Sequence, residues 1–301
     1  MSRAAVVVNP VKLTDPDKFR QTVGAALAEH GWDEPMWLET TLEDPGEGQA
    51  RAAAEAGVDL VLACGGDGTV TAAATGLAGT VTPLAVIPLG TGNLLARNLG
   101  LPVDLDEALT VALTGRRRRL DVGRANGNLF LTMAGLGLDA KMLAGASEAV
   151  KKRFGWGAYV AAALRHLRDR PMRVRLRTDS GRPVRRRASG VIVGNVGALQ
   201  GGVPLLPDAQ PDDGLLDVVV LTARSWSSWL AVVLHVLLRR SEVTDRVLRR
   251  TFAELRIDLD RPHPWELDGE VMGRTRQLVI NISPGALTVL VPPEVRDGET
   301  A

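Results

Sequence analysis

Short apolar runs alternate with helix-like segments over the first 121 residues of the chain. The apolar runs have the length of buried strands and cover residues 4–8, 36–39, 59–63 and 84–87. Segments that have apolar residues at helical spacing, or are rich in Ala, lie between and after them at residues 15–30, 43–56, 71–77, 94–99 and 104–113. Because strands that alternate with helices form parallel sheets, this pattern predicts an α/β domain.

The pattern changes near residue 122. From there short β-like runs separated by turn residues dominate, at residues 129–134, 173–178, 190–195, 216–221, 254–259, 278–282 and 286–291. Such runs predict a mainly antiparallel, β-rich second domain. Two helical segments are expected to interrupt them, at residues 144–167 and 225–240.

Composition excludes several classes of protein. With 301 residues, of which 45% are hydrophobic and 24% charged, the chain has the material for two globular domains. A net charge of +1, with no aromatic platform beside the Arg runs, gives no support for nucleic-acid binding.

The single cysteine, Cys64, fits a reducing cytoplasm. The best apolar run, residues 229–238, is about half the ~20 residues that a membrane helix needs, and the N-terminus lacks a signal-peptide core. A cytoplasmic protein is therefore expected.

A glycine-rich loop, Gly65-Gly66-Asp67-Gly68-Thr69, joins an apolar strand to an Ala-rich helix. The three glycines lack Cβ atoms, so backbone N–H groups can approach an anion at the positive end of that helix. A carboxylate at Asp67 would repel a phosphate unless a cation lay between them. The loop therefore predicts a magnesium nucleotide as its ligand.

Other polar residues follow the neighbouring predicted strands. Ligands of parallel sheets bind where the strands end, so these loops are expected to converge on one crevice. The candidate nucleotide-binding residues are Asn9, Thr40, Thr41, Gly65, Gly66, Asp67, Gly68, Thr69, Gly90, Thr91 and Asn93.

Four motifs, in order, resemble those of the diacylglycerol-kinase-like lipid kinase family. They are Gly-Gly-Asp-Gly-Thr at 65–69, Pro-Leu-Gly-Thr-Gly-Asn at 88–93, Pro-Asp-Asp-Gly-Leu-Leu-Asp at 211–217 and Leu-Asp-Gly-Glu at 267–270. The resemblance spans nearly the whole chain. It implies an α/β, Rossmann-like nucleotide-binding domain with a parallel sheet, followed by a β-rich, β-sandwich-like lipid-binding domain with the active site in the cleft between them. The expected domains are residues 1–121, with 289–301 returning, and residues 122–288.

The resemblance also implies roles for individual acids. Glu270 matches the general base that takes the proton of a lipid hydroxyl, and Asp67 matches the residue bound to catalytic magnesium, with ATP as the nucleotide. Asp121 matches an acidic position at the interdomain edge and is the third candidate catalytic residue. A second, structural magnesium site is implied at Asp213, with the backbone carbonyls of Leu215 and Gln210.

The predicted function is an ATP- and Mg²⁺-dependent lipid kinase that acts on diacylglycerol or a related lipid such as a sphingoid base. Two alternatives stay open. One is an NAD kinase, because that family uses a similar glycine loop. The other is a catalytically inactive nucleotide- or lipid-binding regulator, because Leu94 replaces an Asp that many relatives carry and the loop from Asn9 to Lys12 is shorter than theirs.

Basic and aromatic segments bear on membrane binding. The Arg runs at 116–119 and 182–187 fit a solvated loop or hairpin, and they also fit attraction to an anionic lipid surface. The helix containing Trp226 and Trp229 fits core packing or burial in a membrane interface. The expected partner is a membrane lipid, bound by peripheral association at the inner, cytoplasmic face. The sequence does not specify the oligomeric state, so a homodimer stays open.

Overall fold

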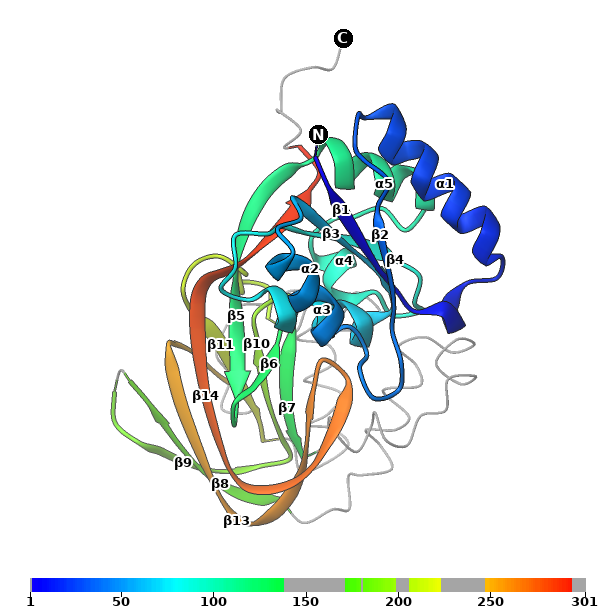
Figure 1. Ribbon diagram of the computed structural model, residues 1–301. Helices are drawn as coiled ribbons and strands as arrows, with labels where there is room; N and C mark the ends of the chain where they lie inside the picture. Colours follow the sequence, from blue (N-terminus) through cyan, green and yellow to red (C-terminus); the bar gives the residue numbers. More distant parts are fainter. Residues whose placement is uncertain (1, 138–170, 180, 199–205, 223–246, 294–301) are drawn as a thin grey trace. The chain divides into compact units, whose positions relative to one another are not determined.

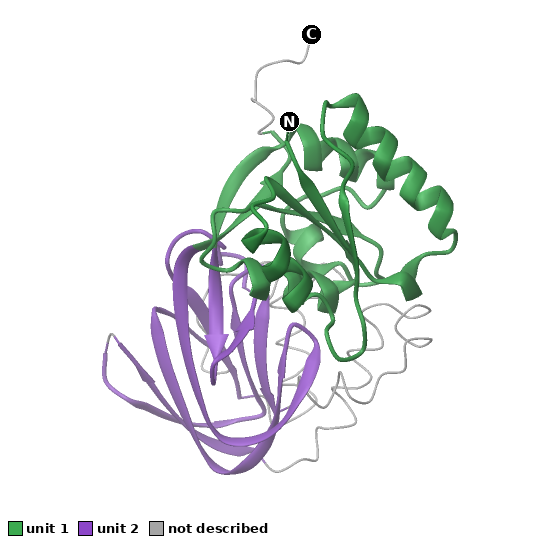
Figure 2. Cartoon of the chain, viewed as in Figure 1, with its two compact units in different colours: residues 1–120, 286–301 green, residues 121–285 purple. Residues whose placement is uncertain are grey.

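The computed structural model describes residues 2–137, 171–179, 181–198, 206–222 and 247–293. The chain divides into two compact units, which Figure 2 colours green and purple. Unit 1 comprises residues 1–120 and 286–301, and unit 2 comprises residues 121–285. The sequence pattern places these divisions at 121/122 and 288/289. The predicted helical segments at 144–167 and 225–240 lie outside the described residues.

Unit 1 is built on a parallel sheet (Figure 1). Its strands lie in the order β14–β4–β3–β1–β2, and every pairing among them is parallel. The predicted parallel sheet is therefore confirmed. The strand bounds are β1 (Ala4–Val8), β2 (Met36–Glu39), β3 (Leu60–Gly65), β4 (Leu84–Pro88) and β14 (Glu270–Val291). β14 pairs with β4 only near its C-terminal end, through Val289.

Helices cover both faces of this sheet. On one face α1 and α5 pack against alternate strand residues such as Val6, Leu62 and Ile87. On the other, α2 and α3 pack against each other and against the strands (Figure 1). Strands buried on both faces are continuously apolar, which is why they are legible in the sequence. The helix bounds are α1 (Pro16–Glu29), α2 (Glu47–Glu55), α3 (Asp67–Leu77), α4 (Leu94–Asn98), α5 (Leu105–Thr114) and a 3₁₀ turn, η1 (Pro10–Lys12).

Three segments differ from the predicted pattern in this part of the chain. The helix expected at 71–77 already begins at Asp67, so the last three residues of the 65–69 loop belong to its first turn. The helix expected at 43–56 begins only at Glu47, because Gly46 has a φ of 136° and the side chain of Asp44 accepts a hydrogen bond from the Gly46 N–H group. The Arg run at 116–119 is not a loop. It begins strand β5 (Arg116–Ala125), which pairs with β14 and β6.

Unit 2 is antiparallel and β-rich, as predicted. Its strands follow the order β12–β11–β10–β7–β13–β14. In addition, β8 pairs with β13, β9 pairs with β8, and β5 pairs with β6. One apolar core fills the unit and includes Phe130, Phe252 and Trp265. The strand bounds are β6 (Asn128–Phe130), β7 (Met133–Gly137), β8 (Met172–Thr178), β9 (Val184–Ala188), β10 (Gly190–Gly194), β11 (Leu216–Leu221), β12 (Val247–Phe252) and β13 (Glu254–Leu267).

Two of these strands are longer than their apolar runs indicate. β13 continues past the predicted end at 259. The sequence pattern misses this continuation because the register shifts between Asp258 and His263 and because two prolines, Pro262 and Pro264, fall within the strand. β14 joins the runs predicted at 278–282 and 286–291 into one strand.

Candidate active site

The two glycine loops of unit 1 lie in backbone contact. Gly65 ends β3 and Gly66 caps α3, while Gly90 follows β4. A Cβ atom added at Gly90 would lie 2.7 Å from the Cα atom of Gly66, closer than real Cβ contacts come. Glycine is therefore required at Gly90 for the loops to approach each other. The structure brings together the 65–69 and 90–93 loops that the sequence predicts to share a ligand.

Polar side chains fix the second of these loops. Asn93 has a left-handed backbone with φ of 47°, and its side chain both accepts from the Gly90 N–H group at 3.1 Å and donates to the Gly90 carbonyl at 2.9 Å. Asp67 Oδ1 accepts a hydrogen bond from the Leu94 N–H group at 2.5 Å. Asp67 therefore joins the start of α3 to the start of α4. The Leu94 side chain is buried, so its backbone rather than its side chain meets Asp67.

The remaining candidate residues follow adjacent strands of the same sheet edge. The Asn9 N–H group donates to the Cys64 carbonyl at 3.0 Å, and the Thr40 N–H group donates to the Val8 carbonyl at 2.9 Å. Thr41 is exposed and its hydroxyl oxygen accepts from the Asp44 N–H group.

Exposure separates the threonines of the two glycine loops. Thr69 is buried against Gly65, where an added Cβ would lie 2.5 Å from the Thr69 Cβ atom, whereas Thr91 is exposed. Gly68, like Gly66 and Asp67, is partly exposed at the start of α3. These loops present N–H groups and hydroxyls at the carboxyl ends of four neighbouring parallel strands, which is an arrangement that suits phosphate binding.

Glu270 stands at the start of β14 in unit 2. It is exposed and pairs with Leu267 across a two-residue turn. The turn residues Asp268 and Gly269 have φ of 46° and 93°, as a tight hairpin turn of type I′ requires. The Asp-Gly-Glu motif is therefore the tip of a hairpin with Glu270 as its first strand residue.

Two acids hold this turn in place. The Asp268 carboxylate accepts hydrogen bonds from the N–H groups of Leu131, Thr132 and Met133 at 2.8–3.0 Å, and from the Thr132 hydroxyl at 2.5 Å. Glu266 is fully buried, and its Oε2 atom accepts from the Gly269 N–H group at 2.8 Å. Glu266 is not among the residues that the sequence motifs single out, although an acid inside an apolar strand end is the signal that points to it.

Asp121 is a second buried carboxylate with backbone partners. Its oxygens accept from the N–H groups of Gly214 and Gly285, each at 2.6 Å, and its own N–H group donates to the Pro211 carbonyl at 2.7 Å. The side chain amide of Asn195 donates to the Asp121 carbonyl at 2.8 Å. Asp121 therefore anchors the 211–217 motif, a link that the sequence does not predict.

The proposed structural metal site lies on the loop that Asp121 holds. Asp213 is exposed, and its Oδ1 atom accepts from the Leu215 N–H group at 2.9 Å. The pKa of Asp217 is raised to about 6, first by burial and then by the nearby charges of Asp213 and Asp208, against a lowering effect of Arg249. This concentration of negative charge fits a divalent cation, as do the exposed Gln210 and Leu215, whose carbonyls are hard donors. No group of three or more ligating side chains occurs among the described residues.

Comparison with known proteins assigns the chain to a family. Residues 3–125 match the model of the diacylglycerol kinase catalytic domain, and residues 132–291 match that of the YegS C-terminal NAD kinase beta sandwich-like domain. The chain belongs to the diacylglycerol-kinase-like lipid kinase family. A probable lipid kinase YegS-like from Pseudomonas aeruginosa is 33% identical over 282 residues, which are 89% of this chain and 88% of that protein. A diacylglycerol kinase from Bacillus subtilis is 28% identical and covers 94% of both chains.

Solved structures agree with membership of the diacylglycerol-kinase-like family. A putative diacylglycerol kinase from Bacillus anthracis superposes with a TM-score of 0.79 at 25% identity, over 98% of this chain and 99% of that one. An NAD kinase from Archaeoglobus fulgidus shares the fold, with a TM-score of 0.52 at 16% identity. The predicted family and fold class are confirmed, and membership implies a kinase that uses a nucleotide. Among the described residues, no helix is long and apolar enough to cross a membrane.

The contact between the glycine loops gives a prediction for this kinase. Gly90→Ala is expected to weaken ATP binding about tenfold, because the new Cβ atom would force Gly66 and Asn93 away from Gly90. Gly24→Ala is the matched control, since nothing lies within 4 Å of a Cβ atom at that helical position. Calorimetric titration with a non-hydrolysable ATP analogue measures both. Equal affinities for Gly90→Ala and Gly24→Ala would contradict the prediction.

Proposed function

We propose that this protein is an ATP- and Mg²⁺-dependent lipid kinase, which transfers the γ-phosphoryl group of ATP to a hydroxyl group of diacylglycerol or of a related lipid such as a sphingoid base. The observation that carries the proposal is the anchored hairpin turn that presents Glu270, in a chain that belongs to a kinase family. An exposed carboxylate on a turn held by two acids is suited to accept a proton in one fixed position.

The proposal assigns the nucleotide to the loops of unit 1. Backbone N–H groups at Gly66 and Gly68, at the start of an eleven-residue helix, would bind phosphate oxygens, and Thr91 and Asn93 border the same sheet edge. Glu270 would take the proton of the lipid hydroxyl as the hydroxyl oxygen bonds to the γ-phosphorus, while the bond from that phosphorus to the β,γ-bridging oxygen breaks and ADP leaves. Positioning and charge neutralisation account for most of the catalysis of phosphoryl transfer. A single base and a rigid phosphate-binding loop are therefore sufficient protein groups for this reaction.

Magnesium belongs to the same proposal. Asp67 would hold the ion that accompanies ATP, and Asp213 with the carbonyl groups of Leu215 and Gln210 would hold a structural one. When bound with ATP, the ion supplies positive charge beside the transferred phosphoryl group. The lipid substrate implies peripheral association with the cytoplasmic face of a membrane.

The deciding experiment measures transfer of labelled γ-phosphate from Mg-ATP to a panel of detergent-dispersed lipids. The panel contains diacylglycerol, a sphingoid base, ceramide and phosphatidylglycerol, and NAD is tested in parallel. Labelling of diacylglycerol or of the sphingoid base is the expected result. Labelling of NAD alone would identify an NAD kinase instead. Tight ATP binding without transfer to any acceptor would identify a nucleotide-binding regulator.

A further inference from the structure

Four arginines of unit 2 gather on one face of the β8–β9 hairpin. Arg173 and Arg175 lie on β8, where they alternate with buried Met172, Val174 and Leu176 and therefore face away from the core. In the antiparallel register Arg173 pairs with Arg187, and Arg175 pairs with Arg185 on β9. Like charges directly opposite each other destabilise a sheet. Arg175 also faces Asp258 on β13, so the uncompensated positive charge of this face lies toward β9, where an anionic partner would offset the repulsion.

The same arginines line a groove of about 500 Å³. Five arginines border it, the fifth being Arg186, against two aspartates of β13, Asp258 and Asp260. In Figure 1 the three strands lie side by side, and the register confirms that β8 lies between β9 and β13. The groove is thus a positively charged hollow on the surface of unit 2.

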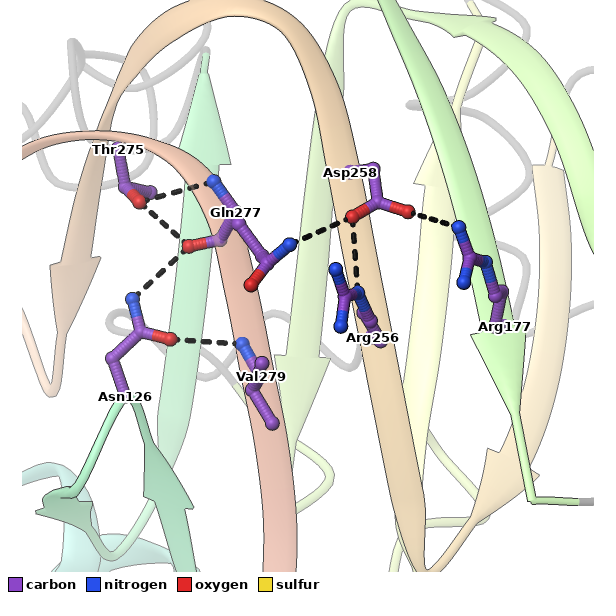
Figure 3. A network of polar contacts seen from close by, with 7 residues as sticks. All are labelled: Asn126, Arg177, Arg256, Asp258, Thr275, Gln277 and Val279. Atoms are coloured by element: carbon purple, nitrogen blue, oxygen red, sulfur yellow. Dashed lines mark hydrogen bonds and ion pairs between the residues drawn. The ribbon is translucent and has the colours of Figure 1, made fainter.

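The acids of the groove are engaged by other residues. Asp258 forms ion pairs with Arg177 at 2.9 Å and Arg256 at 3.1 Å, and accepts from the Gln277 amide at 2.9 Å (Figure 3). Burial raises the pKa of Asp258, but these hydrogen bonds and the arginine charges outweigh it, so the pKa lies below its ordinary value. Asp260 lies 3.8 Å from His263.

Those pairings leave the groove arginines available. Within the described part of the chain, no ion pair includes Arg173, Arg175, Arg185 or Arg187. Protection of an edge strand is the competing explanation for charge on β9, because charged side chains block edge-to-edge pairing. It accounts for Arg185 and Arg187 but not for the arginines opposite them on the inner strand β8, nor for the hollow that the two pairs share.

We propose that this arginine groove docks the protein on an anionic phospholipid bilayer by binding phosphate-bearing headgroups. Guanidinium groups suit this role, since their planar donors match phosphate oxygens and stay charged at every physiological pH. The groove lies wholly in unit 2 and shares no residue with the nucleotide loops or with the Glu270 hairpin. It therefore adds a membrane contact to the proposed lipid kinase and stands on observations independent of that proposal.

The test is sedimentation of the full chain with vesicles that contain neither ATP nor diacylglycerol. Vesicles of phosphatidylcholine with about 30% phosphatidylglycerol are compared with pure phosphatidylcholine, at about 0.15 M salt. Wild-type protein is expected to bind only the anionic vesicles. The double variant Arg185→Gln, Arg187→Gln is expected to bind them about thirty-fold more weakly, because each arginine near an anionic surface contributes about five-fold.

Both altered side chains are exposed on an edge strand, so the variant is expected to stay folded, which circular dichroism checks. A matched control, Lys18→Gln with Arg276→Gln, removes the same charge from exposed positions outside the groove and should bind nearly as wild type does. Equal losses in both variants, or wild-type binding by the groove variant, would overturn the proposal. So would displacement of the wild-type protein from vesicles by inorganic phosphate at matched ionic strength, which would make the groove a site for a soluble anion.

These outcomes are independent of turnover. Loss of vesicle binding leaves the lipid panel to be judged with detergent-dispersed substrates, where docking on a bilayer is not needed. Failure of the proposed kinase activity, in turn, leaves the vesicle result unchanged.

Discussion

Glu270→Gln is expected to lower the rate of lipid phosphorylation about a thousand-fold, the largest effect of any single substitution considered for this protein. The amide keeps the size of the side chain but cannot accept the proton of the lipid hydroxyl. Because Glu270 is exposed and first in its strand, the change should leave the fold intact. The affinity for ATP should also be unchanged, since the proposed nucleotide residues belong to unit 1.

Labelled phosphate transfer to the preferred lipid measures this effect, with the rate and the KM for ATP determined separately. Glu254→Gln is the matched control, because it also removes an exposed carboxylate from unit 2, at the start of β13. The control should retain wild-type activity. A Glu270→Gln enzyme within threefold of the wild-type rate would rule out Glu270 as the base.

Asp268→Ala is expected to destabilise unit 2 by about 3 kcal/mol or more. The substitution removes the acceptor of four hydrogen bonds, and each partly buried donor left unsatisfied costs about 1 kcal/mol. It also places alanine at a φ of 46°, which adds about 1 kcal/mol. Asp268→Asn should cost less, because asparagine tolerates that backbone and keeps one acceptor oxygen.

Hydrogen exchange gives the direct readout. The amides of Leu131, Thr132 and Met133 should lose protection about a hundred-fold in the alanine variant. Asn126→Ala is the matched control, since Asn126 occupies a similar turn with φ of 48° but makes its two backbone bonds to Gln277 and Val279 instead (Figure 3). It should leave the amides at 131–133 protected. Wild-type exchange at these amides in Asp268→Ala would contradict the assigned role.

Asp268 should also act on catalysis through Glu270, as a positioning residue. Because it fixes the turn that precedes Glu270, its loss is expected to lower the turnover rate about tenfold while the KM for ATP stays the same. A change in the KM alone would point to a different role.

Some elements could be located from the sequence with accuracy. The bounds of β1, β2 and β11 coincide with the predicted 4–8, 36–39 and 216–221. Each of these strands is a compact run with clear turn residues at its ends, so a local pattern carries the information. The glycine loops were legible for a similar reason, since a residue without a Cβ atom signals a close backbone approach.

Other elements could not be located in this way. The end of β13 carries Pro262 and Pro264, which local rules exclude from a strand, and its pairing with β14 and β7 extends it to Leu267. The Arg run at 116–119 has no apolar pattern at all, yet β5 begins there and pairs with β14, whereas β6 pairs only with the far end of β5, at 123–125. Pairing between distant segments outweighed local preference in both cases.

The sequence by itself determined the order of strands and helices in the parallel half, the antiparallel character of the second half and the loops that bend at glycine, because periodicity and missing side chains act over a few neighbouring residues. Tertiary structure alone decided what each acid does. Asp121 meets the backbone at Gly285, 164 positions away, and Asp268 meets it at Leu131, 137 positions away. Tertiary structure also placed the arginine pairs 173/187 and 175/185 opposite each other on β8 and β9, where they line one groove. Contacts of this range depend on strand register, which no local pattern specifies.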